Sequence, residues 1–190
     1  MIKWVIMIPV TNLRPGVTFE EDGDIFEVLT YNNVHLRKTS SVVKVKVKSL
    51  KRGMTIEKSF GSNAQVSPVS LYKKDFQFLY KDKDFGYFMN PESFEQINIP
   101  LIKLTGYMFL REGEMTSVRF HGNDPLSILI SPKVRLKIRD TNPGVKGNSA
   151  TNVYKDAVLE TGLKTKVPLF VNIGDEIVVD TRDGSYTSRV

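Results

Sequence analysis

The polar segment Tyr31–Ser41 lies between two runs of strand-forming residues and carries two adjacent cations, Arg37 and Lys38. A lysine at an exposed loop tip can reach a phosphate group, or it can present its amine for covalent modification. His35, in the same segment, is a further candidate for contact with RNA. A solvated hairpin loop has the same composition, however, and composition alone favours that simpler interpretation.

Alternating residues in Val43–Lys48 put three valines on one face of a strand and three lysines on the other. We expect a half-buried strand here. The lysines Lys44, Lys46 and Lys48 could contact RNA phosphates by non-specific electrostatic attraction. They could equally form a solvated face that discourages pairing between sheet edges. The residue pattern leaves both interpretations open.

Aromatic residues alternate along a second predicted strand, where Phe76, Phe78 and Tyr80 share one face. This pattern is more typical of a protein core than of a platform on which RNA bases stack. His121 stands beside the turn dipeptide Gly122-Asn123, so we expect it to be an exposed hairpin residue.

Residues that build catalytic and metal sites are scarce in this chain. There is no cysteine, and the two histidines fall short of the ligands that a zinc site needs. No phosphate-binding glycine loop, dinucleotide fingerprint, nucleophile elbow or HExxH motif occurs. Carboxylates are common, but no pattern indicates the geometry that acid–base catalysis needs. We therefore expect a non-enzymatic protein with no cofactor and no metal site.

Lysine and arginine outnumber aspartate and glutamate by 27 to 21, which gives a formal net charge of +6. A basic balance is compatible with a polyanionic partner such as RNA. The opening residues Met1–Val10 are expected to form a strand rather than a signal peptide, because they contain a proline and no small-residue cleavage site. No apolar run approaches the ~18–20 residues that span a bilayer, so we expect no membrane partner.

Turn residues separate the alternating patterns into short strands. Asp22-Gly23, Gly122-Asn123 and Asp183-Gly184 indicate tight turns, and Lys81–Asp84 indicates a hairpin tip. Only Pro91–Leu110 is expected to be partly helical, from a capped start. The predicted strands are Asp24–Leu29, Val43–Lys48, Thr55–Phe60, Gln77–Tyr80, Gly86–Met89, Thr116–Phe120, Pro125–Ile130, Val134–Arg139, Lys166–Val171, Glu176–Val179 and Tyr186–Arg189.

These strands are too many for one small barrel. We divide the chain into three domains, 1–64, 65–130 and 131–190. Each has roughly 60 residues, which is close to the lower limit for an independent core. Short strands with frequent turns favour an all-β fold of three small β-barrel domains.

The C-terminal third contains short motifs in a specific order, and the first two thirds contain others. In the C-terminal third they are Asn142–Gly147, Lys155–Ala157, Glu160–Gly162, Lys166–Val171, Ile173–Asp175, Asp180–Tyr186 and Ser188–Val190. The earlier motifs are Leu13–Gly16, Asp22-Gly23, Gly53–Phe60, Phe88–Asn90 and Phe94–Gln96. Together they resemble the elongation factor P family along nearly the whole chain.

The resemblance implies an N-terminal SH3-like (KOW-type) barrel followed by two OB-fold barrels in an L-shaped arrangement. It implies a factor that binds the ribosome between the P and E sites, contacts peptidyl-tRNA and stimulates peptide-bond formation at consecutive prolines. The implied partners are both ribosomal subunits, peptidyl-tRNA in the P site, and a lysine- or arginine-modifying enzyme. The protein is then expected to be a cytoplasmic monomer. A generic OB-fold RNA-binding protein without stall-rescue activity is the alternative.

By the same resemblance, Lys38 takes the position of the first-domain loop-tip residue that points toward the CCA end of tRNA and is often modified. The family tip has Pro-Gly before this residue and Gly after it. This chain instead has Leu36-Arg37-Lys38-Thr39, so Arg37 is a second candidate for the role.

A third-domain loop is also similar to one that lies near the E-site codon in the family. Its residues are Gly147, Asn148, Ser149, Ala150 and Thr151. The basic net charge departs from the acidic balance of many family members.

Overall fold

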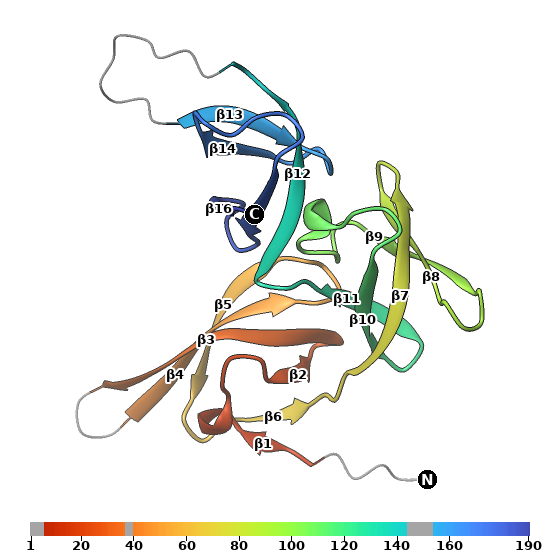
Figure 1. Cartoon of the computed structure of the whole chain (residues 1–190). Helices are drawn as coiled ribbons and strands as arrows, with labels where there is room; N and C mark the ends of the chain where they lie inside the picture. Colours follow the sequence, from red (N-terminus) through yellow and green to blue (C-terminus); the bar gives the residue numbers. More distant parts are fainter. Residues whose placement is uncertain (1–5, 37–39, 144–153) are drawn as a thin grey trace. The chain divides into compact units, whose positions relative to one another are not determined.

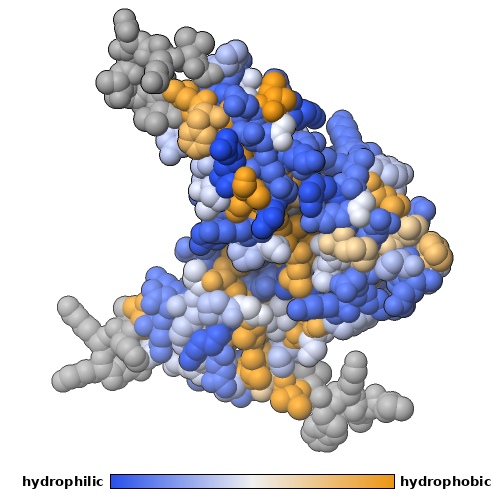
Figure 2. All heavy atoms as spheres, viewed as in Figure 1, coloured by the Kyte–Doolittle hydropathy of each residue, from blue (hydrophilic) through white to orange (hydrophobic). Residues whose placement is uncertain are grey.

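A computed structural model describes residues 6–36, 40–143 and 154–190. Within them the chain forms three β-sheets and two short 3₁₀ turns, η1 (Val10–Asn12) and η2 (Tyr107–Phe109) (Figure 1). None of the helices in this described part has the length and apolarity to cross a membrane. Figure 2 shows that hydrophilic residues cover most of the visible surface. The all-β prediction is confirmed.

The first sheet has six strands in the order β1-β6-β2-β3-β4-β5. Their bounds are β1 (Ile8–Pro9), β2 (Thr18–Glu21), β3 (Asp24–Leu36), β4 (Ser40–Ser49), β5 (Thr55–Gly61) and β6 (Gln65–Pro68). All the pairings in this sheet are antiparallel. The turn between β2 and β3 has positive φ at both Asp22 and Gly23, as the Asp-Gly pattern predicts.

The second and third sheets have five strands each, in the orders β11-β10-β7-β8-β9 and β14-β13-β12-β15-β16. The second contains β7 (Tyr72–Lys81), β8 (Phe85–Met89), β9 (Gln96–Pro100), β10 (Met115–His121) and β11 (Asp124–Leu129). The third contains β12 (Lys133–Thr141), β13 (Tyr154–Leu159), β14 (Lys164–Pro168), β15 (Glu176–Asp180) and β16 (Tyr186–Arg189). Three sheets fit three small barrel-like domains, as predicted.

Every predicted strand overlaps an observed one, because alternation and turn residues are local signals. Four observed strands have no predicted counterpart: β2, β6, β9 and β13. Of the predicted opening strand, Ile8–Pro9 is a strand, and Met1–Val5 lies outside the described residues. The domain division at residues 64 and 130 stays a prediction.

The helical prediction for Pro91–Leu110 is wrong. This stretch contains strand β9 and the single 3₁₀ turn η2. The capping chemistry at its start is nevertheless present, since Asn90 Oδ1 accepts hydrogen bonds from the backbone N–H groups of Glu92 (2.8 Å) and Ser93 (3.2 Å). Here the cap closes a turn instead of a helix, and Phe94 then takes a left-handed φ of 58° before β9 begins.

Residue contacts divide the chain into two compact units. The first contains the described residues up to Lys74 together with Ile99–Thr105 and Val118–Ser127, and the second contains the rest. The first unit has a core of buried residues: Val10, Leu13, Phe19, Phe26, Val28, Val43, Val45, Val47 and Val66. The second has a core of Phe109, Leu136, Ile138, Ala157, Leu159, Val167, Val171, Ile177 and Val179.

Candidate nucleic-acid interface

Strands β3 and β4 form a long hairpin that extends beyond the rest of the first sheet (Figure 1). Their register runs from Phe26↔Ser49 to Leu36↔Ser40, whereas β5 accompanies β4 only as far as Val42↔Gly61. Beyond Val42 the two strands pair with each other alone. The last described pairs, His35↔Ser41 and Leu36↔Ser40, therefore extend past the end of β5.

The predicted tip residues Arg37 and Lys38 lie outside the described residues. His35 belongs to β3 and pairs with Ser41 on β4, which puts its backbone close to the tip. The predicted loop Gly147, Asn148, Ser149, Ala150 and Thr151 also lies outside the described residues. Their proposed contacts with RNA remain predictions.

Lys44 and Lys46 lie on the exposed face of β4, while Val43, Val45 and Val47 are at most 2% exposed. The half-buried strand is therefore confirmed. Asn32 and Ser59 stand opposite Lys44, and Thr30 and Glu57 stand opposite Lys46. Directly opposed residues share a face, so this side of strands β3, β4 and β5 is polar and open to solvent. It can offer cations to a phosphate backbone, although Glu57 offsets part of the charge.

Lys48 has a different environment from the other two lysines. It is half-buried, and its Nζ donates a hydrogen bond to Thr105 Oγ1. Burial lowers the pKa of Lys48, the carboxylate of Glu27 raises it, and the nearby Arg119 lowers it further. Lys48 thus belongs to a polar cluster at the base of the hairpin, where it has protein partners.

The same cluster contains a bidentate ion pair between Glu27 on β3 and Arg119 on β10. Arg119 NH1 and NH2 donate to the two Glu27 oxygens at 3.0 and 2.7 Å, and their side chains are only 15% and 20% exposed. Arg119 Nε also donates to Ser127 Oγ at 2.7 Å. Paired hydrogen bonds of this kind fix direction as well as distance. They hold the base of the β3–β4 hairpin against β10.

Apolar packing supports that junction in the first unit. Ile25, Leu50 and Leu126 form a buried cluster, with Val69 and Leu71 packed against it. No local sequence pattern links Glu27 to Arg119, since 92 positions separate them. Neither residue was predicted as a site residue, and only the folded chain brings them together.

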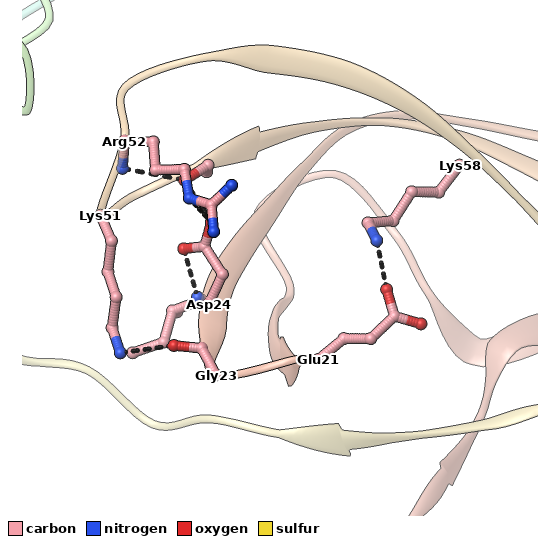
Figure 3. Close-up of polar contacts among 8 residues, drawn as sticks. Glu21, Gly23, Asp24, Lys51, Arg52 and Lys58 are labelled. Atoms are coloured by element: carbon pink, nitrogen blue, oxygen red, sulfur yellow. Dashed lines mark hydrogen bonds and ion pairs between the residues drawn. The ribbon is translucent and has the colours of Figure 1, made fainter.

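A second polar network ties the turn before β3 to the turn after β4 (Figure 3). The Asp24 carboxylate is buried and accepts hydrogen bonds from Ile25 N–H (2.8 Å) and Ser49 Oγ (2.7 Å). Arg52 Nε lies 3.6 Å from the same carboxylate, and Lys51 Nζ donates to the Gly23 carbonyl at 2.7 Å. A buried carboxylate with this many donors is satisfied, so the network is structural.

The aromatic prediction is right for two residues and wrong for the third. Phe76 and Phe78 are buried at 4% and 2% exposure, but Tyr80 is 49% exposed. The register of β7 with β8 shifts between Phe78 and Tyr80, and such a bulge turns the following side chain away from the core face. Tyr80 stacks on Tyr87 with ring centroids 4.6 Å apart. His121 is exposed, as expected.

The motif Asp180–Tyr186 folds into a self-contained turn. Asp180 Oδ1 accepts from Arg182 N–H (3.0 Å) and Arg182 Nε (2.9 Å), and Asp180 Oδ2 accepts from Arg182 NH2. These hydrogen bonds hold the pKa of the Asp180 carboxyl well below its usual range. Gly184 N–H donates to the Asp180 carbonyl, which closes the turn before β16. The motif that carries the resemblance is thus a structural element here.

Metal binding has no support in the described residues. Residues 6–36, 40–143 and 154–190 contain no group of three or more His, Asp or Glu side chains that could hold a metal ion.

The three sheets define the class, an all-β protein, and the family matches identify KOW-like and OB domains in it. Residues 9–66 match the family description "Elongation factor P (EF-P) KOW-like domain", 71–128 match "Elongation factor P (EF-P) OB domain", and 134–189 match "Elongation factor P, C-terminal". The chain belongs to the elongation factor P family, so it is by family a translation elongation factor.

Curated relatives match over nearly the full length. The "Elongation factor P" of Acetivibrio thermocellus is 41% identical over 185 residues, which cover 97% of this chain and 100% of the relative. That of Dictyoglomus thermophilum is 41% identical over 184 residues, covering 96% and 100%. A solved structure, "Eukaryotic translation initiation factor 5A from Methanococcus jannaschii", has a TM-score of 0.50 and 15% identity. It covers 69% of this chain and 98% of its own, and it shows a shared fold alone.

Proposed function

We propose that the chain binds the ribosome between the P and E sites, positions peptidyl-tRNA and stimulates peptide-bond formation at polyproline stalls. The observation that carries this proposal is the match to proteins named elongation factor P across 97% of the chain. The β3–β4 hairpin supports it, because Leu36 and Ser40, which flank Arg37 and Lys38 in the sequence, form the last described pair of a hairpin whose base is held by Glu27 and Arg119.

The proposed mechanism needs no reacting group from the protein. Holding the acceptor end of peptidyl-tRNA in a productive geometry lowers the entropic part of the barrier to peptide-bond formation. A ribbon fixed at its base can transmit such positioning to its tip. We therefore propose a non-enzymatic factor that acts as a monomer in the cytoplasm, where translation takes place.

The proposed contacts follow from the position of each residue. Lys38, with Arg37 as the second candidate, faces the CCA end of tRNA and is the substrate of a modifying enzyme. His35 on β3 and Lys44 and Lys46 on β4 meet RNA phosphate. Lys48 stabilises the base of the β3–β4 hairpin through its hydrogen bond to Thr105. The loop from Gly147 to Thr151 approaches the E-site codon.

A reconstituted translation assay tests the proposal. Ribosomes stalled at Pro-Pro-Pro should resume peptide-bond formation when the purified protein is added at a concentration matched to the ribosomes. The protein is assayed both as purified from its native host and after expression without modifying enzymes. An unchanged stall with both preparations would refute the stall-rescue function.

One sequence departure favours a second candidate function, a generic OB-fold RNA-binding protein. The tip Leu36-Arg37-Lys38-Thr39 lacks the glycines of the family tip, and glycine permits backbone geometry that other residues resist. Binding to free single-stranded RNA as strong as binding to ribosomes that hold peptidyl-tRNA supports this candidate. A clear preference for the ribosomal complex excludes it.

A further inference from the structure

Strand β12 presents a row of cations on its outer face. Val134, Leu136 and Ile138 turn inward, with Leu136 and Ile138 at 0% and 2% exposure. The residues between them alternate to the other side and are all exposed. We call these four the β12 cation row: Lys133, Arg135, Lys137 and Arg139.

The geometry of the strand spaces these charges regularly. Alternate residues on a strand are about 7 Å apart, so the β12 cation row spans about 20 Å. The alternation resembles that of Val43–Lys48, and it is visible in the sequence, although these four residues were not predicted as site residues.

The carboxylates near the β12 cation row either bind another cation or lie beside its two lysines. Asp180 lies opposite Lys133, but its carboxylate accepts the hydrogen bonds of Arg182. Glu176 lies opposite Lys137, and Glu160 Oε1 accepts a hydrogen bond from the Lys137 backbone N–H at 2.9 Å, so Lys137 has two carboxylates beside it. In the described part of the chain, no side chain of the row makes an ion pair or a hydrogen bond.

Arg135 and Arg139 are the least neutralised members of the row. Arg135 stands opposite Val178, and Arg139 falls at the register irregularity between Ile138 and Asp140, where it opposes no residue of β13. Both guanidinium groups can therefore turn to a ligand. Arginine presents a planar set of donors that fits phosphate oxygens at two points.

The β12 cation row also accounts for part of the basic balance of the chain. Residues 131–190 contain ten Lys and Arg against seven Asp and Glu, whereas residues 65–130 contain seven against eight. Four of those ten cations lie on this one strand face. The excess is thus concentrated on a surface instead of being spread over the domain.

We propose that the β12 cation row binds the phosphate backbone of RNA, and thereby adds a contact surface distinct from the β3–β4 hairpin. A row of charges without an apolar anchor fits a regular polyanion, since protein–protein interfaces are depleted of charge at their centres. Contact with backbone phosphates gives affinity and orientation without sequence preference. That the RNA belongs to the ribosomal complex rests on the function proposed above.

The test compares two double variants with the same change in charge. One is Arg135→Glu with Arg139→Glu, and the control is Lys73→Glu with Lys83→Glu, at two exposed lysines of the second sheet region. Binding to an RNA hairpin of about 20 base pairs, without ribosomes, is measured over a range of salt concentrations. Binding to ribosomes that hold peptidyl-tRNA is measured in parallel.

The variant Arg135→Glu with Arg139→Glu should bind the RNA hairpin about tenfold more weakly at low salt. The steepness of the plot of log affinity against log salt concentration should fall by about two, because two phosphate contacts are lost. The lysine control should keep the affinity of the unaltered protein. Arg135→Lys with Arg139→Lys should retain most of the binding, since it keeps the charge.

The inference would be overturned if the arginine variant and the lysine control bound the RNA hairpin with equal affinity, whether or not they bind ribosomes. A loss of ribosome binding by the arginine variant with unchanged hairpin binding would also overturn it, and would identify an acidic protein partner. Stall rescue is scored separately. Its absence in the unaltered protein would count against the proposed function without affecting the hairpin result.

Discussion

At the scale of single residues, the three lysines of β4 show how one alternating pattern covers two environments. Lys44 and Lys46 are exposed beside polar neighbours, whereas Lys48 is half-buried and donates to Thr105. The sequence treats the three alike, because period-2 alternation reports only which face a residue occupies. What lies over that face depends on residues far away in the chain.

Lys38 is the first residue to test by substitution. Lys38→Ala should slow the release of a Pro-Pro-Pro stall by about tenfold, because it removes the group proposed to position the acceptor end. Lys83→Ala, at the exposed tip between β7 and β8, is the matched control and should have no effect. A defect in Arg37→Ala without one in Lys38→Ala would assign the role to Arg37.

Asp180 gives a prediction on pH. Its carboxyl pKa is lowered from an ordinary value of 3.8, so the ionised form stabilises the folded state above that value. This stabilisation should be lost as the pH falls through 4 and below. Asp180→Asn should therefore lower the unfolding temperature at pH 7, and the difference from the unaltered protein should shrink toward pH 3. Thermal unfolding followed by circular dichroism measures both. A difference that stays constant with pH would contradict the assignment.

At the scale of elements, strands with a local pattern were predictable and their pairing partners were not. The alternation in β4 and the Asp22-Gly23 turn are local, and both are confirmed. The Pro91–Leu110 stretch has helix-like capping at Asn90, yet β9 forms there. Sheet pairing outweighs a weak local preference, since β-structure depends on neighbours that are distant in sequence.

The Glu27–Arg119 ion pair should stabilise the base of the β3–β4 hairpin. Arg119→Ala leaves Glu27 largely buried without its partner, so it should lower the free energy of unfolding by about 3 kcal/mol. Arg111→Ala, which breaks the more exposed pair with Glu114, should cost less than about 1 kcal/mol. Denaturant unfolding measures both values. The double variant Glu27→Arg with Arg119→Glu should restore both stability and stall rescue if the ion pair itself is responsible. Equal losses in the free energy of unfolding for Arg119→Ala and Arg111→Ala would contradict this prediction.

At the scale of the whole molecule, the chain consists of two compact units, each with its own buried core. Glu27 and Arg119 belong to the first unit, and Asp180 belongs to the second. Neither Glu27 nor Arg119 is a hydrogen-bond partner of Asp180. The effects of mutations at Arg119 and at Asp180 should therefore be independent.

Hydrogen exchange monitored by residue can test that independence. Arg119→Ala should reduce the protection of backbone amides in β3, β4 and β5 and leave β12 to β16 unchanged. Asp180→Asn should do the reverse, and the double variant should show the sum. If either single variant lowered protection throughout both units by the same amount, the chain would open as one cooperative unit and the prediction would fail.

The sequence by itself determined the family, the all-β class and the inward and outward faces of strands such as β4 and β12. These properties depend on ordered motifs, alternation and turn residues, which act over a few positions. Only the tertiary structure decided that Lys48 is held at the hairpin base, that Glu27 meets Arg119, and that Tyr80 leaves the core at a bulge. Those outcomes depend on which strands pair and in what register, and a change of one residue in register reverses every side chain that follows.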